Sequence, residues 1–247
     1  MFNNGTVRTP EHKSPWVQPG FIAAAAIVAL LVVLGLILAV TGDSDGDAKG
    51  GAANPAPAAP AAPVARDPDA SVCGLPAGDN SVPTKAPRTK WDLIGGVAAP
   101  TATKTLGPGR VTNGLRSCFA HSPTGALYAA VNVIAMTASA DHREAFVRRL
   151  TVPGVGRDRA LSNLGPDSDA TTLQVAGFSV SDYRTRSAVV DLAFRVDTGN
   201  AAGYTHLPLA LRWLDGDWKL ALPDTGRPFD GMARLPSLSG YTPWKGA

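Results

Sequence analysis

Histidine is the side chain most often used for acid–base or metal chemistry, and the sequence offers few arrangements that would use it. The chain has four histidines, at positions 12, 121, 142 and 206. They are dispersed, and no H-x-x-x-H pair of the kind that holds zinc on a helix is present. We therefore interpret them as surface or helix-capping residues and predict no metal site.

Motifs for a nucleophile or for phosphate chemistry are also missing. No G-x-S-x-G sequence occurs, and Ser122, directly after His121, has the position of a helix start. The glycine-rich pieces 107–109 and 154–157 do not follow a predicted strand, as a P-loop would. We predict a protein that is not an enzyme and needs no cofactor. A pair of carboxylates across a cleft is the arrangement that the sequence leaves open.

Residues 21–40 form an uninterrupted apolar run, FIAAAAIVALLVVLGLILAV. Twenty helical residues span about 30 Å, the thickness of the hydrocarbon core of a bilayer. A cleaved signal peptide is the alternative, but its apolar region has about 7–15 residues and a small-residue cleavage site. Arg8 and Lys13 precede the run, and acidic residues follow it. We predict a plasma-membrane protein with a cytoplasmic N-terminus and an extracytoplasmic C-terminal domain.

The segment after the apolar run is too poor in large aliphatic residues to fold by itself. Ala, Pro, Gly and Asp dominate it, a composition typical of an extended spacer. The predicted organisation is a cytoplasmic tail (1–20), a transmembrane helix (21–41), an Ala/Pro-rich stalk (42–70), an irregular arm (71–116), an α+β extracytoplasmic domain (117–223) and a C-terminal tail (224–247).

Cys73 and Cys118 are the two cysteines of the chain, and both follow the predicted membrane span. An even number of cysteines outside the cytoplasm predicts a disulfide, with two unpaired buried thiols as the alternative. Closing a loop of this length would stabilise the fold by roughly 4 kcal/mol on the chain-entropy model.

The charge of the predicted outer part is mildly basic, with 19 Lys and Arg against 14 Asp and Glu beyond residue 70. The basic residues are scattered, and the longest run is the pair Arg148–Arg149. This pattern lacks the concentrated footprint of a nucleic-acid-binding domain, so we expect no direct binding of nucleic acid. It is compatible with a surface that faces anionic wall polymer or lipid head groups.

Helical periodicity begins at residue 122. Ser122 is a good N-cap, Pro123 suits the first helical position, and apolar residues then recur at spacings of three and four. A second helix is predicted over about 141–150, capped by Asp141, with Phe146, Val147 and Leu150 buried. A looser polar segment, about 156–169, follows.

The last third of the chain changes to the alternating pattern of strands. Four strands are predicted, with the turn Asp215–Gly216 joining the last two into a hairpin: 172–180, 188–196, 205–213 and 217–222. Helices followed by strands indicate an α+β fold with helices packed on a curved antiparallel sheet.

The alanine-rich face of residues 126–138 is thin enough to leave a groove opposite the tryptophans of the predicted hairpin. The candidate groove or interface residues are Leu127, Val131, Ile134, Trp213 and Trp218. The alternative interpretation of these five residues is that they fill the core.

Two segments carry a resemblance to a known group of proteins. His121–Asn132 is H-S-P-T-G-A-L-Y-A-A-V-N, and Arg212–Leu220 is R-W-L-D-G-D-W-K-L. With the anchor and stalk, the chain resembles membrane-anchored proteins of conjugative elements in high-GC Gram-positive bacteria. Over about residues 90–222 it is similar to the cone-shaped, cystatin-like fold of nuclear transport factor two, which bitopic type IV secretion assembly factors also use.

The resemblance implies a scaffold in a DNA-transfer channel that acts by protein–protein contact. Its expected partners are the lipid bilayer, other secretion or conjugation subunits and further copies of itself. The alternative is an extracytoplasmic ligand-binding or sensory module, with a small molecule or lipid between helix and sheet. A cell-envelope enzyme is a third class, which would need converging polar groups in that space.

Overall fold

A computed structural model describes residues 67–137, 142–164, 173–197 and 202–245. The predicted cytoplasmic tail, the predicted transmembrane helix and most of the predicted stalk lie outside these residues. Within the described ranges, no helix has the length and apolar character needed to span a membrane. The described residues all belong to one compact unit.

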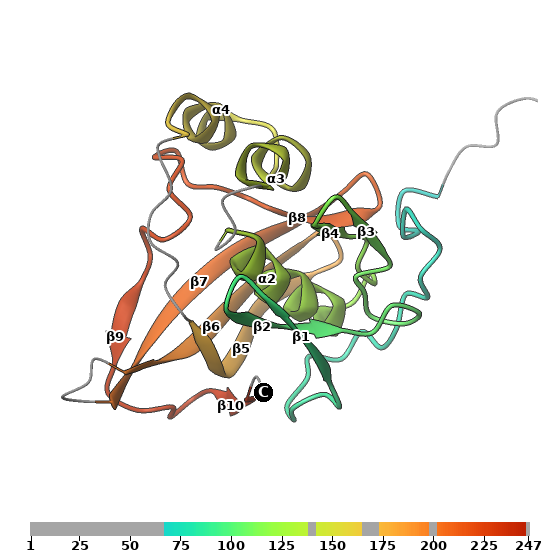
Figure 1. The fold of residues 1–247 in the computed structure, drawn as a ribbon. Helices are drawn as coiled ribbons and strands as arrows, with labels where there is room; N and C mark the ends of the chain where they lie inside the picture. Colours follow the sequence, from blue (N-terminus) through green and yellow to red (C-terminus); the bar gives the residue numbers. More distant parts are fainter. Residues whose placement is uncertain (1–66, 138–141, 165–172, 198–201, 246–247) are drawn as a thin grey trace, which may run out of the picture. The chain divides into compact units, whose positions relative to one another are not determined.

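An antiparallel sheet forms the centre of this unit (Figure 1). Its main strands run in the order β10-β5-β6-β7-β8, and β9 pairs with β7 on the same sheet. The α+β class and the antiparallel pairing are thereby confirmed. The strand bounds are β5 Gln174–Arg184, β6 Ser187–Asp197, β7 Ala202–Leu214, β8 Asp217–Leu220, β9 Ala233–Leu235 and β10 Thr242–Pro243.

The alternating pattern explains which face of the sheet is buried. On β6, Val190, Leu192 and Phe194 are fully buried, while Asp191 lies on the opposite face. The turn between β7 and β8 is formed by Asp215 and Gly216, with φ of 55° and 76°. Positive φ at both turn residues is typical of a two-residue hairpin, so the predicted hairpin is confirmed.

Three helices are described: α2 Pro123–Thr137, α3 Arg143–Leu150 and α4 Val155–Ser162. The predicted cap of α2 is present, since Ser122 Oγ accepts a hydrogen bond from the Gly125 amide at 3.1 Å. The buried face of α3 is the predicted one, whereas its predicted cap, Asp141, lies outside the described residues. The sequence predicted a looser polar segment over about 156–169. This prediction was wrong for residues up to 162, because α4 (Val155–Ser162) forms there.

The predicted irregular arm contains two β-hairpins, which corrects the sequence interpretation. β1 (Lys90–Ile94) pairs with β2 (Val97–Thr101), and β3 (Arg110–Thr112) pairs with β4 (Leu115–Ser117). Gly95–Gly96 and Asn113–Gly114 form the turns, all with positive φ. Pro100 is tolerated because a two-stranded ribbon leaves one edge of each strand unpaired.

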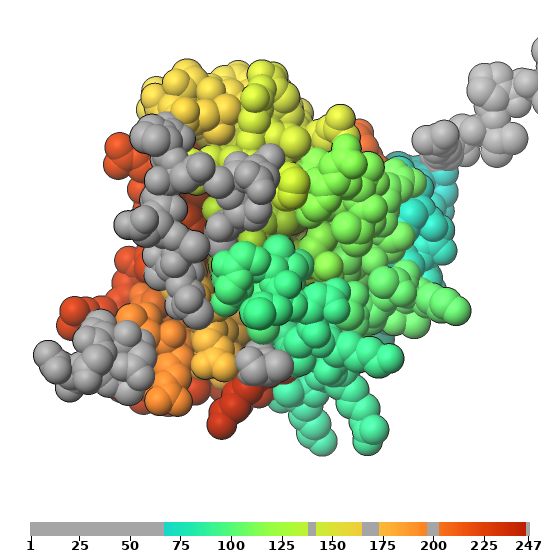
Figure 2. Space-filling view, viewed as in Figure 1, coloured from blue at the N-terminus to red at the C-terminus, as the bar shows by residue number. Residues whose placement is uncertain are grey.

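The first hairpin encloses α2. Residues 97–100 of β2 are buried and contact α2, while the sheet contacts the same helix through its strands β5 to β8. Thirteen of the 15 residues of α2 are therefore buried. In the space-filling view the hairpin, coloured green, lies at the surface near the middle of the face shown (Figure 2).

A buried polar network joins the arm to α2. The Arg116 guanidinium donates to Asn132 Oδ1 at 2.6 Å and to Asp92 Oδ2 at 3.0 Å. The Asn132 amide in turn donates to the carbonyl of Pro100 at 3.1 Å. The Arg116 side chain is 8% exposed, so its charge depends on these partners.

We predict that Arg116→Lys lowers the free energy of unfolding by about 2 kcal/mol, because one ammonium cannot reach both acceptors of a planar guanidinium. Equilibrium urea unfolding of the full-length chain in detergent checks this. Arg110→Lys, on an exposed position of the same hairpin, is the matched control and should change the stability by less than about 0.5 kcal/mol. Equal midpoints for the two variants would contradict the prediction.

The C-terminal segment wraps the sheet and inserts one side chain. Trp244 is 3% exposed, and its ring centroid lies 4.7 Å from that of Trp91 on β1. Its Nε1 donates to Thr89 Oγ1 at 3.1 Å. The end of the chain therefore fastens the arm to the sheet.

Candidate functional site

The predicted groove residues all lie in the core. Leu127, Val131, Ile134, Trp213 and Trp218 have exposed fractions between 0% and 4%. None of them lines the two clefts described below. The structure therefore places these five residues in the core, as the alternative interpretation proposed, and both β2 and the sheet pack against α2.

The predicted disulfide between Cys73 and Cys118 is present, with the two Cα atoms 6.1 Å apart. It fastens the first described residues to the loop that precedes α2. Next to it the Val72 amide donates to the carbonyl of Gly216, in the β7–β8 turn, at 2.8 Å. We call residues 67–73, together with the side chains that hold them, the junction.

Aromatic side chains hold Pro68 and Asp69 of the junction in place. His121 stacks on Trp213 with ring centroids 4.0 Å apart and meets Trp218 edge-on. Trp213 Nε1 donates to the carbonyl of Pro68 at 3.0 Å, and His121 Nδ1 lies 2.9 Å from the carbonyl of Asp69. Thus His121, predicted as a surface or capping residue, is 6% exposed.

An ion pair on the surface adds to the same attachment. The Asp69 carboxylate meets the Arg186 guanidinium at 3.1 Å. Asp69 thus contacts the folded unit through its carbonyl and through its side chain. The end of the predicted stalk is therefore fixed in position by backbone, aromatic, ionic and covalent contacts.

Asp217 is the buried charge of the junction, and the sequence analysis did not single it out. Its carboxylate accepts hydrogen bonds from the amides of Cys118 at 2.7 Å, Phe119 at 2.8 Å and Trp218 at 2.9 Å. Burial nevertheless raises its pKa to about 6, because desolvation outweighs these bonds. Cys118, one of the three donors, has a φ of 66°. The acidic turn Asp215-Gly216-Asp217 is the sequence signal that could have pointed to this residue.

Two clefts open between the elements around α3. The first, which we call the apolar cleft, has a volume of about 480 Å³. It lies between α3, α4 and residues 222–229, with Phe146 and Phe229 among its apolar lining and Arg143 and Arg227 beside them. Its size falls within the range of small-molecule sites. Thr137 alone comes from α2.

The second, which we call the basic cleft, has a volume of about 390 Å³ and lies between the β3–β4 hairpin, the end of α3 and the β7–β8 turn. Arg110, Arg149 and Lys219 contribute to its lining, together with Asp215 and Asp217. These cations are far apart in the sequence, so a search for basic runs misses the cleft.

A hydrogen-bonded group lies on the face of the sheet opposite α2. His206 Nδ1 is 2.9 Å from Asp191 Oδ2, and the Tyr241 hydroxyl donates to the same oxygen at 2.6 Å. Burial and the Asp191 carboxylate raise the pKa of Tyr241. The group fastens the C-terminal segment to β6 and β7.

In the described ranges no cluster of three or more His, Cys, Asp or Glu could hold a metal ion.

Fold and site together define an α+β domain whose N-terminal entry is held by a disulfide-closed junction. The chain belongs to the family described as domain of unknown function (DUF8175), whose model matches residues 53–243. The match includes part of the predicted stalk, the arm and the sheet. Searches of curated proteins and of solved structures found no match.

Proposed function

We propose that the protein is a single-pass plasma-membrane scaffold of a conjugative DNA-transfer or type IV secretion-like apparatus, acting by protein–protein contact. The observation that carries the proposal is the junction, which holds residues 67–73 directly after the predicted stalk. Because the junction attaches the end of the predicted stalk rigidly to the folded domain, the position of the stalk sets the position of the domain. A scaffold protein requires such an attachment. His121, Trp213 and Trp218 come from the two segments on which the resemblance rests.

The finer fold assignment belongs to the same proposal. A helix of 15 residues packed on a four-stranded antiparallel meander, β5 to β8, supports a cystatin-like relation to nuclear transport factor two. The β1–β2 hairpin is an addition that covers the helix on its other side. In this proposal the addition closes the ligand space of the fold and favours contact by the outer surface.

Two exposed aliphatic side chains on the arm are the proposed contact positions. Leu93 on β1 is 78% exposed and Val111 on β3 is 55% exposed. Both lie on strands of two-stranded ribbons, where unpaired backbone groups allow a partner to add. The proposed partners are other channel subunits or a second copy of the chain.

Photo-crosslinking in native membranes tests the proposal. A benzophenone amino acid at position 93 or 111 of the full-length chain is expected to capture channel subunits or the transfer ATPase, identified by mass spectrometry. The matched control is position 155, where Val155 on α4 is 58% exposed. Capture of the same proteins from position 155, or of none from positions 93 and 111, would remove the support for a scaffold.

The apolar cleft favours a second candidate, an extracytoplasmic ligand-binding or sensory module. A small molecule or lipid that fills it should co-purify with the full-length chain in detergent and be detected by native mass spectrometry. Ala160→Trp, which fills the cleft from α4, should abolish the co-purification. Val155→Trp, exposed on the same helix, should retain it. Retention by both variants would contradict binding in this cleft.

A further inference from the structure

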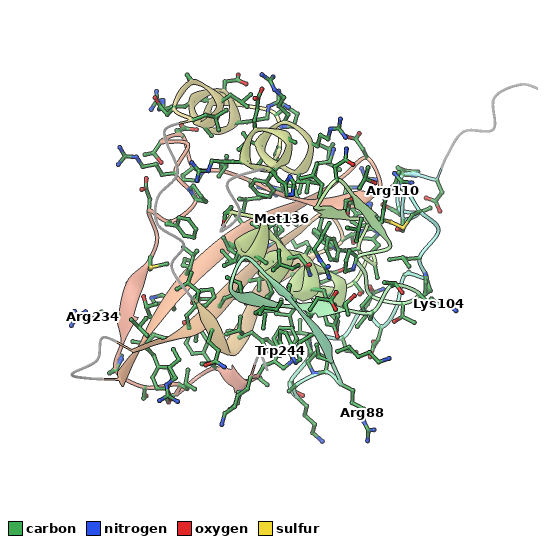
Figure 3. All side chains as sticks on the ribbon, viewed as in Figure 1. Arg88, Lys104, Arg110, Met136, Arg234 and Trp244 are labelled. Atoms are coloured by element: carbon green, nitrogen blue, oxygen red, sulfur yellow. A yellow bond between two sulfur atoms is a disulfide. The ribbon has the colours of Figure 1, made fainter. Side chains whose placement is uncertain are left out.

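The basic cleft combines two arginines from different elements of the fold. Arg110 lies on β3 and Arg149 in the last turn of α3, and both line the cleft. Among the residues that the structure describes, neither guanidinium has a hydrogen-bond or ion-pair partner. Figure 3 shows Arg110 on the side of the unit where the disulfide lies. Two unpaired guanidinium groups on one cavity attract an anion.

The two acidic residues of the cleft are bonded to groups other than these arginines. Asp215 pairs with Lys219, whose Nζ lies 2.5 Å from its carboxylate. Both oxygens of Asp217 accept backbone amides, Oδ1 from Phe119 and Trp218 and Oδ2 from Cys118. Three cations, Arg110, Arg149 and Lys219, therefore line the cavity with two carboxylates, which leaves the lining with a net positive charge.

We propose that the basic cleft binds a phosphate group, borne by a polyol phosphate or by a lipid head group. A guanidinium donates two parallel hydrogen bonds to adjacent phosphate oxygens, and the terminal oxygens of a phosphate have enough lone pairs to accept from two such groups. The cavity, at about 390 Å³, also holds the glycerol or sugar to which the phosphate is esterified. Leu115 and Leu150 provide an apolar wall for its carbon atoms.

The position of the cleft connects the site to the junction. Val72, next to Cys73, lines the cavity. Asp217 also lines the cavity, and it accepts a hydrogen bond from Cys118 in the junction. A bound phosphate would thus contact the residues at which the chain enters the folded unit. Because a ligand that binds the folded state alone stabilises it, phosphate should raise the unfolding temperature. The proposal is independent of the scaffold function.

The test is titration of the full-length chain in non-ionic detergent at constant ionic strength, followed by thermal unfolding and calorimetry. The probes are inorganic phosphate, glycerol phosphate and soluble dihexanoyl phosphatidylglycerol. Saturable binding is expected, together with at least a tenfold loss of affinity in Arg110→Gln/Arg149→Gln. Tightest binding of glycerol phosphate would assign the source to a polyol phosphate, and tightest binding of the lipid would assign it to a head group.

A charge-matched variant separates a site from general electrostatic attraction. Arg195→Gln/Arg234→Gln removes two exposed arginines from other strands of the sheet, and Figure 3 shows Arg234 on β9, far from Arg110 in this view. This variant should bind the probes as the unaltered chain does. Equal losses in both double variants, or no saturable binding of any probe, would overturn the proposal. All four replaced side chains are exposed, so folding should be preserved.

Discussion

Replacing both cysteines, in Cys73→Ser/Cys118→Ser, is expected to lower the free energy of unfolding by roughly 4 kcal/mol. The disulfide closes a loop with a sequence separation of 45 residues, so its loss releases a large conformational entropy to the unfolded chain. The loop contains both hairpins of the arm, and their attachment to α2 should loosen with it. Urea unfolding of the full-length chain, followed by tryptophan fluorescence, measures the change.

Reduction provides an internal control for this variant. Dithiothreitol should shift the midpoint of the unaltered chain toward that of the double variant and leave the double variant unchanged. Labelling with a maleimide verifies that the bond has been reduced. If the fully reduced chain unfolded at its original midpoint, the disulfide would have no stabilising role and the fixed junction would lose its main support.

Asp217→Ala is expected to lower the free energy of unfolding by about 4 kcal/mol, because three buried amides lose their acceptor and each unsatisfied group costs about 1–3 kcal/mol. Asp217→Asn should lose about half as much. Its oxygen can still accept from Phe119 and Trp218, whereas its amide nitrogen would face the Cys118 amide. Urea unfolding at pH 7 distinguishes the two variants.

The control for Asp217 is its neighbour in the same turn. Asp215 is 72% exposed, so Asp215→Asn should change the stability by less than about 0.5 kcal/mol. A similar loss for Asp215→Asn and Asp217→Asn would show that the turn, and not the three buried bonds, sets the stability. The role assigned to Asp217 would then be wrong.

The pKa of Asp217 also predicts a dependence on pH. Burial raises this pKa from its ordinary value of 3.8 to about 6, so the folded state holds the proton more tightly than the unfolded state does. The contribution of Asp217 to stability therefore rises as the pH falls from about 6 to about 4 and is lost above that range. The stability difference between the unaltered chain and Asp217→Asn should widen over this interval. A difference that narrows toward pH 4 would contradict the assignment.

Elements with local signals could be predicted from the residues of their own segment. The cap and periodicity after Ser122 predicted α2, and alternation with the Asp215–Gly216 turn predicted the hairpin of β7 and β8. The disulfide was predictable because the chain offers a single pairing. The arm was misjudged because its proline and glycine content masked two hairpin signals, Gly95–Gly96 and Asn113–Gly114, which were present in the sequence.

Tertiary structure alone decided which faces are covered and which charges meet. The alanine-rich helix α2 could have lined a groove or a core, and it became core because both β2 and the sheet pack against it. Arg110, Arg149 and Lys219 belong to three elements, and their approach depends on how those elements pack. Asp217 is buried because the Cys118–Phe119 backbone folds over it. Such contacts join residues that are tens of positions apart, up to 99 for Asp217 and Cys118, whereas periodicity, capping and turn signals extend over only a few residues.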